Sequence, residues 1–183
     1  EETSEPYAIA KIAGIKMCEA YNRQYGTNFI CAVPTNIYGP NDNFDLDNSH
    51  VIPALIRKFH EAKVKEQTAV TIWGTGSPIR EFMYVNDLAD ACLFLLENYN
   101  SSEIINVGSG EEISIKELSH LVKDVIEYRG EIIFDKSKPD GAPRKVLDGS
   151  KLKNLGWGAK TSLKEGVEIT YEWYLKYSKG DIG

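Results

Sequence analysis

Apolar and polar positions follow two different periods along this chain, and the period changes from segment to segment. Apolar residues at helical spacing predict helices over residues 7–25, 49–62, 87–98, 113–128 and 163–177. Short apolar runs between turn residues predict strands over 28–33, 70–73, 104–107 and 131–134, with residues 81–85 extended. Stretches rich in Pro, Asn, Asp and Gly predict loops over 34–48, 74–78 and 136–145. Strands that alternate with helices predict a layered α/β fold, with segments 28–33 and 104–107 in one parallel sheet.

The signals at the ends of the first helix are specific. Ser4 can cap it, and Pro6 fits the first turn, where a missing N–H costs no hydrogen bond. Gly26 is expected to end the helix, because glycine readily adopts the left-handed conformation found there.

Composition narrows the class of protein. With 183 residues, 42% of them hydrophobic, the chain can bury a core without disulfides or a metal. Its three cysteines (Cys18, Cys31 and Cys92) form no paired motif, so we expect buried free thiols, a reducing compartment and no metal site. A net charge of -6 without a basic block argues against nucleic acid. No apolar run approaches the roughly 18 residues of a membrane span, and residues 1–6 do not resemble a signal peptide, so we expect a cytoplasmic protein.

Tyr7 and Lys11 form the first candidate for catalysis. They lie four residues apart in a predicted helix and therefore share one face of it. A lysine ammonium held close to a phenol favours the phenolate, so such a pair can transfer a proton at a carbonyl or alcohol oxygen. Taken alone, a tyrosine and a lysine at this spacing are common on helix surfaces.

Further motifs follow this pair in a fixed order. Pro34-Thr35-Asn36-Ile37-Tyr38-Gly39-Pro40 comes one predicted strand later, and this order resembles the extended short-chain dehydrogenase/reductases. Segments 41–44, 48–60, 73–82 and 138–145 resemble the GDP-L-fucose synthase family within that group. The resemblance covers essentially the whole chain. It implies the C-terminal part of a doubly wound parallel (Rossmann) sheet, formed by residues 1–40 and 80–110, plus a small α/β substrate domain, formed by 41–79 and 111–183.

The resemblance also implies an activity and a cofactor. The expected reaction is the NADPH-dependent 3,5-epimerisation and 4-reduction of GDP-4-keto-6-deoxy-D-mannose to GDP-L-fucose. Tyr7 would give a proton to the oxygen on carbon 4, Lys11 would support it and hold the ribose, and His50 would act as an acid in the epimerisations. The expected NADP(H) site consists of Tyr7, Lys11, Pro34, Asn36, Ile37 and His50. His60 and His120 have no expected role.

A nucleotide diphosphate sugar requires cations for its pyrophosphate, even on an acidic protein. The resemblance implies a substrate site formed by Asn36, Lys58, Trp73, Arg80, Arg144 and Lys145. The planar fork of Arg80 suits bidentate phosphate binding. Lys58 keeps the charge of the arginine that many relatives carry there, but it lacks the fork. For Arg144 and Lys145 a solvated loop, and for Trp73 a place in the core, remain open alternatives.

A dinucleotide-binding G-x-G-x-x-G motif is missing, and Gly108-Ser109-Gly110 lacks the third glycine. We therefore expect on the order of 120 further residues before residue 1, which would make this chain an inactive fragment of a homodimeric enzyme. Cys18 cannot replace the cysteine that the family places in that missing part, because it lies about 16 Å along the helix from Tyr7. Another nucleotide-sugar epimerase or dehydratase, or a non-catalytic sugar-nucleotide-binding module, remain the alternatives.

Overall fold

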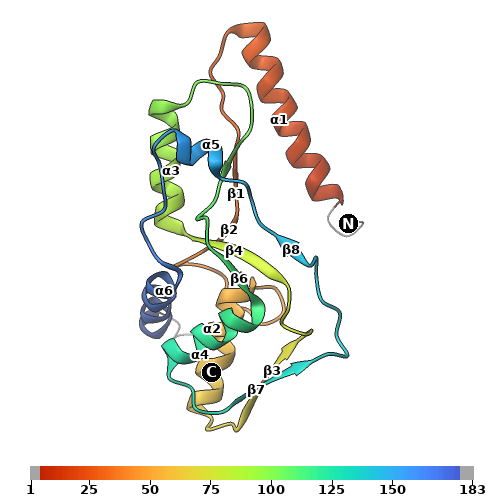
Figure 1. Ribbon diagram of the computed structural model, residues 1–183, viewed down its shortest axis with the longest axis vertical. Coiled ribbons are helices and arrows are strands. Elements are labelled where there is room, and N and C mark those ends of the chain that lie inside the picture. The colour runs from red at the N-terminus through yellow and green to blue at the C-terminus, as the bar shows by residue number, and fades with distance from the viewer. Residues whose placement is uncertain (1–4, 178–183) are drawn as a thin grey trace.

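Strand β4 (Ile79–Tyr84) crosses the middle of the molecule and contributes to both of its hydrophobic cores. The computed structural model describes residues 5–177. Successive side chains of a strand point to opposite faces. Met83 therefore belongs to the hydrophobic core of the upper part of the molecule in Figure 1 (the upper cluster), and Phe82 and Tyr84 belong to the core of the lower part (the lower cluster). The upper and lower parts in Figure 1 therefore meet at this strand.

The upper part contains two paired strands with helices around them. Its elements are α1 (Glu5–Tyr25), β1 (Ala32–Pro34), α3 (Val85–Asn98), β5 (Ile105–Val107) and α5 (Ser150–Asn154). Strands β1 and β5 are parallel, with Val33 opposite Asn106, which confirms the expected pairing of these two segments. Ala91 and Leu95 of α3 pack against them and against Trp157 in the upper cluster.

The lower part contains short strands on both edges of β4 and a separate pair of strands. Three strands within residues 5–177 pair with β4. Strands β2 (Asn36–Tyr38) and β8 (Arg144–Lys145) run parallel to it, and β6 (Glu112–Ser114) runs antiparallel. The separate pair consists of parallel β3 (Ala69–Trp73) and β7 (Glu131–Asp135). Three helices pack beside these strands: α2 (Val51–Val64), α4 (Ile115–Ile126) and α6 (Leu163–Tyr177).

Helix α2 forms the centre of the lower cluster. Ile52, Ile56 and Phe59 recur at helical spacing and are almost completely buried. They meet Val122 and Ile126, the corresponding apolar positions of α4. The predicted helices 49–62, 113–128 and 163–177 are therefore confirmed, because each carries one continuous apolar face to bury.

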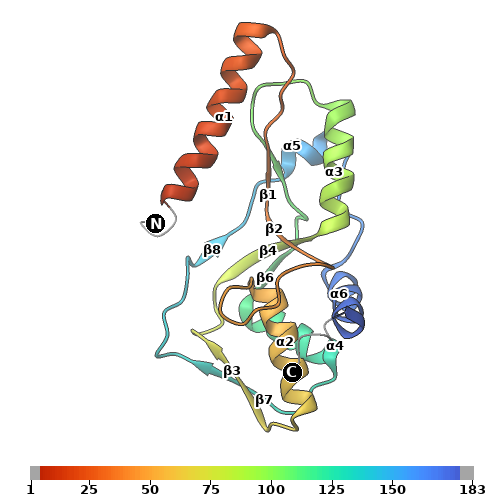
Figure 2. The same ribbon diagram turned by 180° about the vertical axis from the view of Figure 1, so that it is seen from behind.

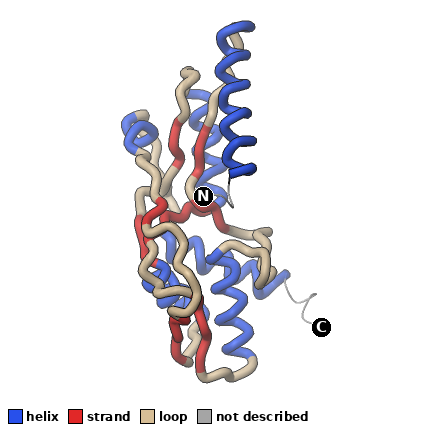
Figure 3. Tube along the Cα trace, turned by 90° about the vertical axis from the view of Figure 1, so that its right-hand side faces the viewer, coloured by secondary structure: helices blue, strands red, loops and turns tan. Residues whose placement is uncertain are grey.

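Helix α1 contains no buried residue and lies on the outer side of the upper part (Figure 3). Its predicted end is confirmed, since Gly26 follows Tyr25 with a φ of 65°. The proposed cap Ser4 lies outside the described residues. Met17 and Ile12 of this helix are more than half exposed. No helix within residues 5–177 combines the length and apolarity required to cross a bilayer.

The predicted strand over residues 28–33 is too long. Asn22 at the end of α1 explains the difference, because its side chain bonds the backbone N–H and C=O of Phe29, each at 2.8 Å. A segment whose backbone groups bond to a side chain cannot use them in a sheet. Phe29 therefore lies outside the strand, which begins at Ala32.

Three short strands lie where the sequence predicts a loop or a helix. Strand β2 lies in the predicted loop 34–48, β8 in the predicted loop 136–145, and β6 includes the first residues of the predicted helix 113–128. Each forms because β4 supplies pairing partners from far away in the sequence. The true start of α4 is a capping box, in which Ser114 accepts from the Glu117 N–H and Glu117 accepts from the Ser114 N–H.

The expectation of three buried thiols is wrong for Cys92, which is exposed, and overstated for Cys18 and Cys31, which are partly exposed. Cys92 lies on α3 next to Ala91, and only the Ala91 side of that helix faces the upper cluster. The helical period thus places Cys92 outside the core.

Candidate active site

Two neighbouring cavities lie where β2, β4 and the start of α2 meet. The first has a volume of about 250 Å³, and its lining includes Asn36, Ile37, His50 and Arg80. The second, about 240 Å³, is lined by Lys58, Trp73 and Arg80, among others. Because Val51, Arg80 and Ile115 line both, the two cavities are adjacent and are treated as one candidate site.

Asn36 is fixed in place by the neighbouring strand. Its Nδ2 donates to the backbone oxygen of Glu81 at 2.7 Å, and the hydroxyl of Thr35 donates to the same oxygen at 3.0 Å. The pairing of β2 with β4 sets this contact, since Asn36 lies opposite Phe82 in the register. Asn36 lines the first cavity from this fixed position.

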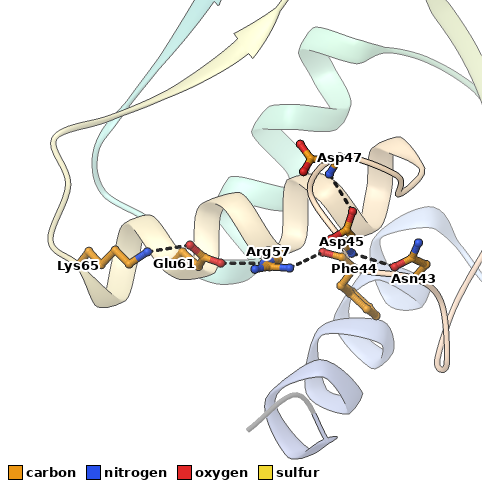
Figure 4. A network of polar contacts seen from close by, with 7 residues as sticks. All are labelled: Asn43, Phe44, Asp45, Asp47, Arg57, Glu61 and Lys65. Atoms are coloured by element: carbon orange, nitrogen blue, oxygen red, sulfur yellow. Dashed lines mark hydrogen bonds and ion pairs between the residues drawn. The ribbon is translucent and has the colours of Figure 1, made fainter. Parts of the chain in front are cut away.

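His50 lies at the N-cap of α2, with an exposed side chain that forms no capping hydrogen bond. The loop before it is tied to α2 by Arg57, which donates to the Phe44 backbone oxygen at 3.2 Å and to Glu61 at 2.7 Å (Figure 4). Hydrogen bonds from Arg57 and then from Lys65 lower the pKa of Glu61. The loop that ends at His50 is therefore held in place by hydrogen bonds, and the His50 imidazole lines the first cavity without a capping bond.

The ring of Phe44 fastens the same loop from the other side. It lies 4.8 Å from the ring of Tyr174 and stacks on Trp173 at 6.0 Å, both on α6. His60 belongs to this aromatic group, since its Nδ1 lies 3.0 Å from the Tyr171 hydroxyl. The position of His50 thus depends on packing between α2 and α6, which are far apart in sequence.

At the second cavity, two lysine side chains lie near the exposed indole of Trp73. Trp73 is 68% exposed, which removes the alternative of a core tryptophan. The Nζ atoms of Lys138 and Lys58 lie 5.5 and 6.0 Å from its ring centroid, within reach of a cation–π contact. Arg80 points its Nη1 at the backbone oxygens of Ile79 and Ala142, at 2.8 and 2.7 Å. Such a wall suits an anionic ligand with an aromatic or sugar ring.

Asp140 also lines the second cavity and is not among the residues expected there. It accepts from the Thr75 N–H at 2.9 Å and the Thr75 hydroxyl at 2.7 Å, and these bonds lower its pKa. Gly74 allows the approach, because a Cβ there would lie 2.3 Å from the Asp140 carboxylate. Asp140-Gly141 is a turn signal, but only the fold shows that this turn closes over the end of β3.

Tyr38 is a second cavity residue without an expected role. It is buried, lines the first cavity, and donates to the Leu163 backbone oxygen at 3.3 Å. Burial raises the pKa of its phenol, and the nearby carboxylate of Asp87 adds to the effect. Tyr38 therefore stays neutral and acts as a hydrogen-bond donor in the wall of the cavity.

The remaining expected residues lie outside both cavities. Tyr7 and Lys11 are exposed on α1, with the Lys11 Nζ 5.4 Å from the centroid of the Tyr7 ring. Pro34 is exposed at the end of β1. Arg144 and Lys145 are exposed on β8, and Arg144 forms a two-point ion pair with Glu112. The structure thus brings together Asn36, Ile37, His50, Lys58, Trp73 and Arg80.

No group of three or more metal-binding side chains comes together within residues 5–177.

Parallel strands joined through helices define a Rossmann-type α/β protein. The NAD dependent epimerase/dehydratase family matches residues 1–108, and the chain belongs to this family.

Similar proteins extend the likeness over nearly the whole chain. GDP-L-fucose synthase 1 of Arabidopsis thaliana is 58% identical over 96% of this chain, and GDP-L-fucose synthase of Escherichia coli is 49% identical over 96%. A solved GDP-L-fucose synthetase of Naegleria fowleri bound to NADP is 30% identical, with a TM-score of 0.88 over 94% of this chain and 56% of its own. The chain spans about half the length of the curated relatives, 54% and 58% of these two.

Proposed function

We propose that this chain is the later part of a GDP-L-fucose synthase, which epimerises carbons 3 and 5 of GDP-4-keto-6-deoxy-D-mannose and reduces carbon 4 with NADPH. The observation that carries the proposal is the pair of cavities joined at Arg80, one with His50 and Asn36 and the other with Lys58 and Trp73. One is suited to a reacting sugar and the other to a nucleoside diphosphate. The 58% identity to a relative of that name supports the same assignment, and its coverage of 54% supports a longer protein.

The substrate would lie with its diphosphate against Arg80 and Lys58. Charge-assisted hydrogen bonds are stronger than neutral ones, so two cations in one cavity favour a dianion even on a protein of net charge -6. Trp73 offers an exposed aromatic face to a ring. In the pairing of β8 with β4, Lys145 lies opposite Arg80 and would add positive potential at the rim. The charge of Arg144 is paired with Glu112, so Arg144 would contribute only by releasing that partner to the substrate.

The residues expected at the cofactor fit NADP(H) by their chemistry. Tyr7 and Lys11 present a hydroxyl and an ammonium on one face of α1, a suitable pair for ribose hydroxyls. Pro34 is the last residue of β1, and Asn36 and Ile37 follow it, at the edge where Rossmann folds bind dinucleotides. When bound, NADPH supplies the hydride for carbon 4.

The protein's own groups would handle protons. Tyr7 would give its phenolic proton to the carbon 4 oxygen as negative charge develops there, and the ammonium of Lys11 would stabilise the resulting phenolate. Each epimerisation removes a proton next to the carbonyl from one face and returns one to the other face. The cysteine expected in the part of the protein before residue 1 would remove the first proton, and His50 would give a proton to the carbanion from the other face.

The division of the chain into two units is also a proposal. Residues 1–40 and 80–110 would form the Rossmann part, and 41–79 and 111–183 the substrate part. The upper and lower clusters support two units. Leu152 and Trp157 pack into the upper cluster and would bring the chain back to the first unit. A homodimer and a cytoplasmic location stay predictions.

Two variants of the intact protein test the proposed function. Tyr7→Phe should lower the rate of reduction by more than tenfold and leave GDP affinity unchanged, because the phenol acts only as charge develops. His50→Gln should lose most incorporation of deuterium from heavy water at carbons 3 and 5, while direct reduction of the unepimerised keto sugar persists. Normal fucose formation in either variant would contradict the assigned role.

A second candidate is a GDP-sugar reductase of another specificity. A solved GDP-mannoheptose C4 reductase of Campylobacter jejuni is 38% identical, with a TM-score of 0.83. Turnover of GDP-heptoses with no turnover of the 6-deoxy sugar would favour it. Binding of GDP without any turnover by the intact protein would favour a non-catalytic module.

A further inference from the structure

Glu81 is a completely buried carboxylate in the middle of β4. A buried charge is costly unless hydrogen bonds satisfy it. The backbone N–H of Gly110 donates to Oε1 at 2.8 Å, and the backbone N–H of Leu147 donates to Oε2 at 3.0 Å. No lysine or arginine within residues 5–177 forms an ion pair with it. Two separate segments, one after β5 and one after β8, are thus held by a single side chain.

The Gly108-Ser109-Gly110 segment is built around this carboxylate. A Cβ on Gly108 would lie 2.3 Å from the Glu81 Oε1, and the three atoms nearest to it all belong to the Glu81 carboxylate. Gly110 has a φ of 80° and open space around it, so glycine is favoured there by the left-handed backbone conformation and not by lack of room for a side chain. Glycine-rich turns after strands often present amides to a phosphate. Here the carboxylate of Glu81 accepts the hydrogen bond from the Gly110 N–H.

The hydrogen bonds around Glu81 continue to Asn36. The segment that Gly110 ends begins at Val107, whose backbone oxygen accepts from the Thr35 N–H at 3.0 Å. The Thr35 hydroxyl and the Asn36 Nδ2 then return to the backbone oxygen of Glu81. Thr35 and Asn36 are therefore held by a closed set of contacts that depends on Glu81 through both its side chain and its backbone.

We infer that Glu81 is a positioning residue for Asn36 in the first cavity. Its carboxylate holds the segment 108–110 and the segment at 147 against β4, and the first of these segments reaches Asn36 through the Val107 oxygen and Thr35. Arg80 is anchored separately by the Ala142 backbone oxygen, so the diphosphate end of the site does not depend on Glu81. This inference rests on the proposed function for the turnover it affects, though not for the contacts themselves.

Glu81→Gln in the intact protein tests the inference. The variant keeps the shape but turns one oxygen into an N–H₂ group that faces an amide donor. We expect kcat for the keto sugar to fall at least tenfold and the affinity for GDP to change less than threefold. Glu97→Gln on the exposed side of α3 removes the same charge and should change neither. A kcat within twofold of wild type would overturn the inference, and so would a parallel loss of GDP affinity.

Gly108→Ala provides a second test that leaves every charge in place. Its methyl group would push the carboxylate away, so kcat should fall as in Glu81→Gln. In a Glu81→Ala background the same substitution should cost less than a further twofold, because the obstructing carboxylate is gone. An equal loss in both backgrounds would show that Gly108 acts for another reason and would overturn the inference.

The side-chain amide signals of Asn36 in a nitrogen-15 NMR spectrum distinguish this inference from the proposed function. They should shift in Glu81→Gln and stay unchanged in Glu97→Gln, whether or not the protein turns over nucleotide sugars. An intact wild-type protein without activity, but with this shift, would refute the proposed function and leave the positioning contact standing. Unshifted Asn36 signals would overturn the inference alone.

Discussion

Arg80→Lys examines the contribution of the guanidinium that the two cavities share. In the wild-type structure Nη1 is occupied by the backbone oxygens of Ile79 and Ala142. The other guanidinium nitrogens form no hydrogen bond with residues 5–177, which leaves donors for a ligand. Lysine keeps the positive charge, but it has no second donor in a fixed plane, so it cannot hold the Ala142 oxygen and a phosphate together.

The size of the effect follows from the bonds that are lost. One hydrogen bond to a charged group contributes about 1.5–3 kcal/mol, and each 1.4 kcal/mol changes an affinity about tenfold. Arg80 is only partly buried, so solvent screens the interaction and the lower end of that range applies. We expect GDP to bind about 10-fold more weakly to Arg80→Lys. The lost bond to Ala142 should lower the free energy of unfolding by about 0.5–1.5 kcal/mol.

Calorimetric titration of GDP into the intact protein measures the first effect, and urea denaturation measures the second. Arg129→Lys serves as the matched control, because this exposed arginine lies at the far end of α4, next to Gly130. It should leave the affinity for GDP unchanged. Equal affinity of Arg80→Lys and wild type would refute the reasoning that the free face of the guanidinium binds the diphosphate.

Three further substitutions address stability. Phe59→Ala empties the centre of the lower cluster and should lower the free energy of unfolding by about 3–5 kcal/mol, as measured by urea denaturation. Asp87→Ala leaves the N–H groups of Lys160 and Thr161 without their acceptor and should cost about 1–3 kcal/mol in the same measurement. Burial lowers the pKa of His60 from 6.5, so the unfolded chain binds this proton more readily and stability should fall as the pH decreases through that value. His60→Gln should remove that part of the pH dependence, and an unchanged slope would refute it.

Local sequence determined the long elements of this protein. Helices α2, α4 and α6 could be predicted because each has a repeating apolar face, and such a face requires only neighbouring residues to be recognised. The end of α1 was predictable for a similar reason, since one glycine, Gly26, is sufficient to provide the left-handed conformation that ends the helix. The capping box of Ser114 and Glu117 was also present in the sequence and would have given the correct start of α4.

Six of the residues that line the two cavities could be named from motifs, but their arrangement could not. Asn36, His50 and Arg80 lie in separate segments, and they meet only because β2 pairs with β4 and the loop before α2 packs on α6. Asp140 gave no signal beyond a turn. Its role depends on its contact with Thr75, which lies 65 residues away in the sequence, and no local pattern predicts such a contact.

The tertiary structure alone decided the short strands and the place of Glu81. Strands β2, β6 and β8 contain two or three residues each, too few for an alternating pattern, and they exist because β4 offers backbone partners on both edges. In the sequence Glu81 is one of many charged residues. It becomes a buried anchor because Gly110 and Leu147, 29 and 66 residues away, bring their N–H groups to it. Period and composition determine which faces are apolar, whereas contacts between distant segments determine which polar groups are buried together.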